Sequence, residues 1–454
     1  MGIVLKGGMI ITASDSYKAD IYIEGEKIQA IGNDFTSDEI IDVSGCYIFP
    51  GAIDCHTHFA LETMGTITAD DFATGTKAAI IGGTTAIIDY ATQYKGESLL
   101  TALDKQFKKA VNCYCDFGFH MGITDWNEST GYEMERLMIL GVTSFKLYMA
   151  YKNSLQVDDG VIYQALKKSK DISGLVTVHC ENGDIINELV KEAISEKHLF
   201  PIYHAKTRPD IVEKEAISRV LTISELTGAS IYIVHLSTNM GLESIIDAKR
   251  RGVNVFVETC PQYLLLDDSL YFSEGEKYIM SPPLRKIEDN IALWKGLSNN
   301  LIDTVATDHC SFNYNGQKNC DHNFSKIPNG APGVEHRLAL MYTYGVMKNR
   351  ITLNQLVSYL STNPAKIFGL FPNKGTIAVG SDADIVVYDP NVKNVISAKN
   401  QNQNVDYTPY EGFEKMGLVK YTFLRGRMIV KDEQLVENEP LGKYIYRKPF
   451  KGGM

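Results

Sequence analysis

The chain has 454 residues, which is enough for a large core and more than one structural unit. Hydrophobic residues make up 44% and charged residues 22%, as is typical of a globular enzyme. The 45 basic and 55 acidic side chains give a net charge of −10, which argues against a surface for nucleic acid or an anionic membrane.

The first residues do not have a basic segment followed by an apolar one, so we expect no signal peptide. The most apolar windows are short and interrupted by polar residues, and we expect no transmembrane helix. The eight cysteines contain no Cys-x-x-Cys pair, and we expect reduced thiols packed as small hydrophobic side chains. These features predict a cytoplasmic protein with no membrane partner.

Both ends of the chain have the pattern of β-structure. Residues 21–31 contain two apolar runs around a glycine-bearing turn, which predicts a hairpin. Strand-like runs return at residues 383–388 and 424–430. Because neither end could fold alone, we expect them to form one small β-sandwich domain, residues 1–50 plus 375–454.

Between the two ends, short β-branched runs alternate with amphipathic helical segments, such as those beginning at Asp70, Ser98 and Asp210. Eight such runs are found, at residues 52–58, 84–90, 116–123, 142–149, 175–180, 230–236, 253–259 and 302–308. This α/β pattern predicts a (β/α)₈ TIM-like barrel over residues 51–374. A doubly wound open sheet is the alternative, but the absence of a Gly-x-Gly-x-x-Gly loop and a Walker lysine disfavours its nucleotide-binding versions.

Metal-competent side chains lie in or at the ends of these runs. His56 and His58 flank one residue, so both imidazoles lie on one side of an extended chain. The later runs contribute Lys146, His179, His235 and Asp308. A single histidine or aspartate there is more often a hydrogen-bonded interior residue or a helix cap. The recurrence of the whole set at the carboxyl ends of the strands, where barrel enzymes place reactive groups, favours a metal site.

Four imidazoles and one carboxylate suit zinc, and would also suit manganese or cobalt. Lys146 is the odd member, because an ammonium repels a metal ion and is costly to bury without a partner. Lys146 is therefore either paired in a salt bridge or modified into an anion.

Several longer motifs carry a resemblance to a known family over nearly the whole chain. They lie at residues 49–54, 69–72, 82–85, 145–151, 258–263, 281–285, 328–333 and 406–413. Together with the set of histidines, lysine and aspartate, these motifs resemble those of the amidohydrolase superfamily and, more narrowly, of the D-hydantoinase and dihydropyrimidinase family. Within that family the chain looks most like the bacterial phenylhydantoinase type, especially in the last motif.

The resemblance implies two zinc ions per subunit, about 3.5–4 Å apart, bridged by a hydroxide and by a carbamate on Lys146 (N6-carboxylysine). It places the remaining ligands in two sets, with His56, His58 and Asp308 on the more buried ion, and His179 and His235 on the other.

The implied reaction is hydrolysis of a small cyclic ureide or imide, which opens 5-substituted hydantoins and/or dihydropyrimidines to N-carbamoyl amino acids. By the family pattern, Tyr151 stabilises the developing oxyanion and Asp308 transfers the proton. Ser281 and the backbone of Asn329 are expected to bind the imide edge. From the residues alone, Tyr151 would equally well cover the barrel mouth, and Ser281 and Asn329 would be turn residues.

The chain departs from the sequence patterns of other members of the superfamily. Dihydroorotases typically carry arginine at the position of Ala60, and allantoinases tend to lack the tyrosine at position 151. Collapsin-response-mediator proteins share the fold as non-catalytic scaffolds but lack a full ligand set. The departures from dihydroorotases and allantoinases favour a hydantoin or dihydropyrimidine ring. The full ligand set favours a hydrolase acting on C–N bonds in cyclic amides over a scaffold, and the family further implies a homotetramer or homodimer.

Overall fold

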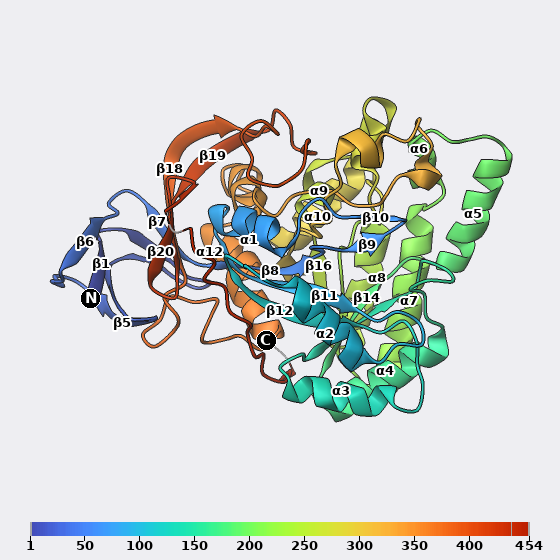
Figure 1. Ribbon diagram of the computed structural model, residues 1–454, viewed down its shortest axis with the longest axis horizontal. Coiled ribbons are helices and arrows are strands. Elements are labelled where there is room, and N and C mark those ends of the chain that lie inside the picture. The colour runs from blue at the N-terminus through green and yellow to red at the C-terminus, as the bar shows by residue number, and fades with distance from the viewer. Residues whose placement is uncertain (1, 437, 453–454) are drawn as a thin grey trace.

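Eight parallel strands form the centre of the larger domain (Figure 1). The computed structural model describes residues 2–436 and 438–452. The barrel strands are β8 (Ala52–Thr57), β11 (Thr84–Thr92), β12 (Asp116–Gly122), β13 (Ser144–Tyr148), β14 (Leu175–His179), β15 (Ile231–Ile233), β16 (Val255–Thr259) and β17 (Thr304–Val305). They are hydrogen-bonded in chain order from β8 to β17.

The first and last of these strands approach each other and nearly close the barrel. Thr57 forms a parallel bridge with His309, and the His58 N–H donates to the His309 carbonyl at 2.8 Å. The predicted (β/α)₈ barrel is therefore confirmed.

Helices connect the strands and cover the outside of the barrel (Figure 1). They are α1 (Phe72–Ile81), α2 (Leu99–Lys109), α3 (Thr130–Ile139), α4 (Asp159–Asp171), α5 (Gly183–Ser195), α6 (Ile202–Lys206), α7 (Asp210–Thr227), α8 (Asn239–Arg250), α9 (Pro261–Leu265), α10 (Ile287–Ser298), α11 (Arg337–Leu340), α12 (Leu353–Val357) and α13 (Asn363–Ile367). The predicted helix after Asp70 is confirmed, because the Asp71 side chain caps α1 and Gly82 ends it.

The chain ends meet in a second domain, where strands from the N-terminus and the C-terminus lie side by side (Figure 1). One sheet has the order β5-β4-β1-β6, and the other has the order β21-β20-β19-β18-β7-β2-β3. The strands are β1 (Gly2–Lys6), β2 (Met9–Ile11), β3 (Ser16–Lys18), β4 (Asp20–Glu24), β5 (Lys27–Gly32), β6 (Glu39–Asp42), β7 (Tyr47–Pro50), β18 (Ile385–Val395), β19 (Glu414–Leu424), β20 (Arg427–Lys431) and β21 (Gln434–Leu435). β7 pairs antiparallel with β18, so the expected small domain from both termini is confirmed.

Three details differ from the prediction. β15 and β17 end before His235 and Asp308, because both residues have left-handed backbones with φ of 38° and 53°. The run at residues 424–430 was expected as one strand. It contains the turn between β19 and β20, where Arg425 and Gly426 have positive φ.

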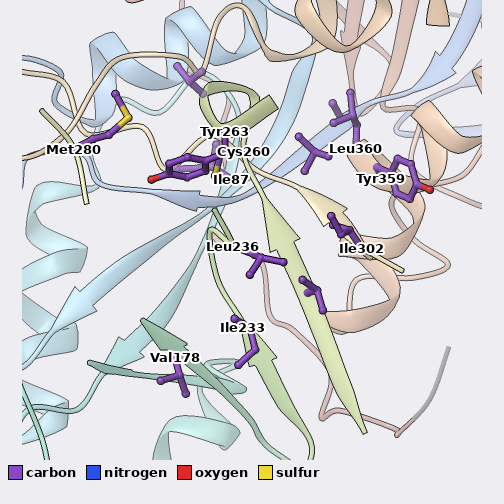
Figure 2. Packing of buried hydrophobic residues seen from close by; sticks show 14 of the residues in the cluster. Ile87, Val178, Ile233, Leu236, Cys260, Tyr263, Met280, Ile302, Tyr359 and Leu360 are labelled. Atoms are coloured by element: carbon purple, nitrogen blue, oxygen red, sulfur yellow. The ribbon is translucent and has the colours of Figure 1, made fainter. Parts of the chain in front are cut away.

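The main core lies between the barrel strands and the surrounding helices. Figure 2 shows part of it, including Val178 of β14 and Ile233 of β15, which lie side by side on neighbouring strands. All eight cysteines are free, and seven of them are buried. Within the residues that the structure describes, no helix is both long enough and apolar enough to span a membrane. Two short strands, β9 (Glu62–Thr63) and β10 (Thr66–Ile67), form a hairpin after β8.

Candidate metal centre

The first cluster of predicted ligands forms where the barrel closes. His56 Nε2 and His58 Nε2 lie 3.1 and 3.2 Å from Asp308 Oδ1, so three ligand atoms converge on one point. His56 is directed inward by a β-bulge, because β8 has one more residue than β11 between the pairs Asp54–Ile87 and Thr57–Asp89.

The second cluster adjoins the first. His179 Nδ1 lies 2.9 Å from His235 Nε2, and the His235 ring lies 5.5 Å from the His56 ring. His179 Nε2 is 2.9 Å from a carboxylate oxygen of Glu181, which accepts a hydrogen bond from the Nε2–H and leaves Nδ1 as the atom available to a metal ion. The structure therefore brings all four histidines together.

Lys146 lies in β13 inside the barrel and is 1% exposed. Its Nζ atom lies 5.0 Å from the ring centre of Tyr90 and 5.4 Å from that of Tyr148, and within the described residues no carboxylate forms an ion pair with it. Burial lowers the pKa of Lys146 to about 8, although Asp308 and Glu258 oppose the shift. A larger share of the amine is thus neutral near pH 7 than in an exposed lysine.

The donor set fits a metal centre completed by an anion on Lys146. The ligand types are those that zinc and related ions prefer. In the part of the chain that the structure describes, the buried Tyr90 hydroxyl makes no hydrogen bond. An anionic group on the nearby lysine would supply an acceptor in this region.

The predicted substrate residues lie at the edge of the two clusters. The Tyr151 ring lies 5.0 Å from the His179 ring. Burial raises the pKa of Tyr151 well above its ordinary value, so its hydroxyl stays protonated and can donate a hydrogen bond. Ser281 is buried beside Tyr151. Asn329 lies in the neighbouring loop, whose Gly330 N–H donates to the Ile279 carbonyl at 3.0 Å.

Two buried carboxylates in the site were not singled out from the sequence. Glu181 contacts His179, and Glu258 contacts His56 at 2.6 Å. The spacing of Glu181, two residues after a predicted ligand, was an available signal because such residues share a side of an extended chain. Glu258 belonged to a motif of the resemblance but had no role assigned.

A cavity of about 420 Å³ adjoins the first cluster. It lies between the loop after β8 and helix α2, and its lining includes His58, Tyr90, Leu61, Tyr94 and Lys109. The cavity provides room for a small molecule next to the predicted metal ligand His58.

Comparisons with known proteins agree with this geometry. The family model described as "Amidohydrolase family" matches residues 47–429. The chain is 45% identical to a D-hydantoinase of Geobacillus stearothermophilus, over 98% of this chain and 97% of the relative. It is 39% identical to a D-phenylhydantoinase of Escherichia coli O1:K1 / APEC, over 99% of both chains. The crystal structure of a dihydropyrimidinase from Brevibacillus agri NCHU1002 superimposes with a TM-score of 0.98, at 44% identity and full coverage of both chains.

Proposed function

The chain belongs to the amidohydrolase family, and on this premise we propose that it opens the ring of 5-substituted hydantoins or dihydropyrimidines to give N-carbamoyl amino acids. The observation that carries the proposal is the convergence of His56, His58 and Asp308 in a barrel that also holds Lys146. The similarity to hydantoinases extends over the full chain, and so it includes every segment that carries these residues.

We propose that the centre holds two zinc ions per subunit. His56, His58 and Asp308 would hold one ion, and His179 and His235 the other, with Lys146 between them as N6-carboxylysine. The bound ions would supply Lewis acidity and a water molecule that loses its proton near neutral pH.

Lys146 can form this carbamate by a simple addition. The neutral Nζ attacks carbon dioxide, an N–C bond forms, and one N–H proton is released to solvent. Its lowered pKa supports the step, because only the unprotonated amine has a free electron pair.

Other side chains would bind the substrate and transfer a proton to it. The Tyr151 hydroxyl donates a hydrogen bond to the ring carbonyl oxygen as negative charge develops there. Asp308 accepts the proton of the attacking water and delivers it to the ring nitrogen as the C–N bond breaks. Ser281 and the backbone of Asn329 bind the imide edge and hold the ring in place.

A substrate panel tests the proposed activity. Zinc-loaded protein would be incubated with hydantoin, phenylhydantoin, dihydrouracil, dihydrothymine, allantoin and dihydroorotate, and ring opening followed by ultraviolet absorbance. We expect hydrolysis of the hydantoins or dihydropyrimidines, and little of the last two. Hydrolysis of allantoin or dihydroorotate alone would contradict the proposed substrate class.

Metal analysis distinguishes the enzyme from a non-catalytic scaffold. Two equivalents of zinc per subunit are expected for protein purified with bicarbonate and zinc. A folded protein that takes up no metal under these conditions would support the scaffold instead.

We further propose the division into a sandwich of residues 1–50 plus 375–454 and a barrel of residues 51–374. We also propose that the protein acts in the cytoplasm as a homotetramer, with a homodimer as the alternative. Light scattering coupled to size-exclusion chromatography would measure the assembly, and four subunits per particle are expected.

A further inference from the structure

Glu258 occupies a central position beneath the predicted metal ligands. It lies in β16 and is completely buried. Its Oε1 atom is 2.6 Å from His56 Nδ1 and accepts the His235 backbone N–H at 2.9 Å. Its Oε2 atom accepts the Tyr232 hydroxyl at 2.9 Å. One carboxylate thus contacts residues from two other barrel strands, β8 and β15, and from the segment after β15.

The contact with His56 determines which ring nitrogen is free. A carboxylate oxygen accepts hydrogen bonds, so His56 Nδ1–H donates to Glu258 Oε1. Nε2, which lies 3.1 Å from Asp308 Oδ1, is then the nitrogen that would bind a metal ion. A carboxylate behind a ligating histidine fixes the ring orientation and increases its basicity.

The contact with His235 acts on the main chain. His235 has a left-handed backbone with φ of 38°, which is unfavourable for a residue with a Cβ atom. The hydrogen bond to Glu258 holds this N–H in place, and with it the direction in which the side chain leaves the backbone. The ring then reaches His179, with 2.9 Å between the two nitrogens.

We propose that Glu258 is a positioning residue that couples the two halves of the metal centre. The same oxygen atom orients His56, a ligand of one proposed ion, and His235, a ligand of the other. A substitution that loosens this carboxylate therefore weakens the binding of both proposed ions. The inference rests on the proposed function only in taking these histidines as metal ligands.

The experiment measures metal affinity directly. Metal-free wild type and Glu258→Gln would be titrated with Zn²⁺ in bicarbonate buffer against a chromogenic chelator. Glutamine keeps the size of the side chain but loses its charge, and we expect both zinc equivalents to bind about 10–100-fold more weakly. The visible absorption of the Co²⁺-substituted variant should also shift, because the ligand field around both ions changes.

Asp303→Asn is the matched control. The Asp303 carboxylate is also buried and accepts the N–H of Val257, the residue before Glu258 in β16, at 2.8 Å. Its ion pair is with Lys249 and not with a predicted metal ligand. This variant should lower the melting temperature while leaving zinc affinity unchanged. If Glu258→Gln does not fold, Glu258→Asp, which keeps the charge on a shorter side chain, should show the same loss of affinity in weaker form.

The outcomes separate the two proposals. Wild-type affinity for both equivalents in the folded Glu258 variants would overturn the positioning role and leave the proposed function intact. Weakening of only one equivalent would overturn the coupling. A wild-type protein that binds no zinc would overturn the proposed function, and this inference with it.

Discussion

At the scale of single residues, Lys146 is the side chain whose surroundings most restrict its chemical state. Its amine is enclosed by tyrosine rings and histidines, and no carboxylate in the described part of the chain neutralises it by an ion pair. Burial of such a group is unfavourable unless its charge is removed or reversed. The proposed carbamate on Nζ would reverse this charge and would also supply the bridging ligand that the proposed centre needs.

Replacing Lys146 with alanine should remove the bridging ligand and most of the bound zinc. A short carboxylic acid added to Lys146→Ala should restore part of the metal and activity by occupying the vacated space. Metal content by atomic absorption measures the effect, with Lys191→Ala, an exposed lysine of α5, as the control. Full zinc content in Lys146→Ala would contradict the bridging role.

Asp308→Asn should lower kcat by about 10²–10⁴-fold and change KM much less, because an amide cannot carry the proton. Steady-state rates normalised to the measured zinc content separate this effect from metal loss, since Asp308 is also a proposed ligand. A kcat near that of the wild type would show that another group transfers the proton.

Much of the site could be predicted at the level of residue identity. His56, His58, Lys146 and His179 lie in or beside strands, where side-chain alternation and the strand ends place them. The role of Glu258 could not be predicted, because it depends on contacts among strands that are distant in sequence and become neighbours only in the barrel.

At the scale of elements, a buried lysine joins two loops near the site. Lys318 Nζ donates to the carbonyls of Ile279 and Pro328, both at 2.9 Å. These loops carry Ser281 and Asn329. Their relative position therefore depends on a residue from a third segment of the chain.

The pH dependence of stability tests this arrangement. Burial lowers the pKa of Lys318 to about 7, from an ordinary value of 10.5. Between these values the unfolded chain binds a proton that the folded chain does not, so the free energy of unfolding rises with pH. The difference between wild type and Lys318→Met should therefore grow from pH 7 to pH 10, by up to about 1.4 kcal/mol per pH unit.

Urea unfolding at several pH values measures this difference. Lys326→Met, an exposed lysine of the same region, should show no such growth relative to the wild type. A constant difference for Lys318→Met would indicate that Lys318 remains protonated throughout the range.

Element types were largely predictable, because the runs and helix caps are local signals. The strand boundaries near His235, Asp308 and Arg425 could not be predicted. Each of these residues has a positive φ, which is uncommon for a residue other than glycine and cannot be inferred from its type. Tertiary contacts, such as the hydrogen bond from His235 to Glu258, hold these conformations.

At the scale of the whole molecule, Lys374 connects the barrel to the sheet domain. Its Nζ lies 2.7 Å from an oxygen of Asp116 at the start of β12 and 2.5 Å from one of Asp384 beside β18. Burial opposes its charge, yet the surrounding carboxylates, including Asp382, raise the pKa of Lys374 above its ordinary value. The interface thus contains a buried ion network.

Lys374→Met should lower the free energy of unfolding by about 3–5 kcal/mol, because the buried Asp384 carboxylate loses its ion-pair partner. Asp116 keeps its contact with Arg425, and Asp382 keeps its contact with Lys27. Lys393→Met removes an exposed ion pair with Glu414 and should cost about 0–1 kcal/mol. Urea denaturation measures both, and zinc content should stay the same. Equal stability of the two variants would mean that the buried network does not hold the domains together.

The pairing of β7 with β18 also affects how the protein is made. A ribosome adds about 5–20 residues per second, so roughly twenty seconds to a minute pass between the synthesis of β7 and that of its partner strand β18. During that time one edge of the strand is open to other chains. The nascent polypeptide is therefore open to pairing with other chains at this edge until β18 has been synthesised.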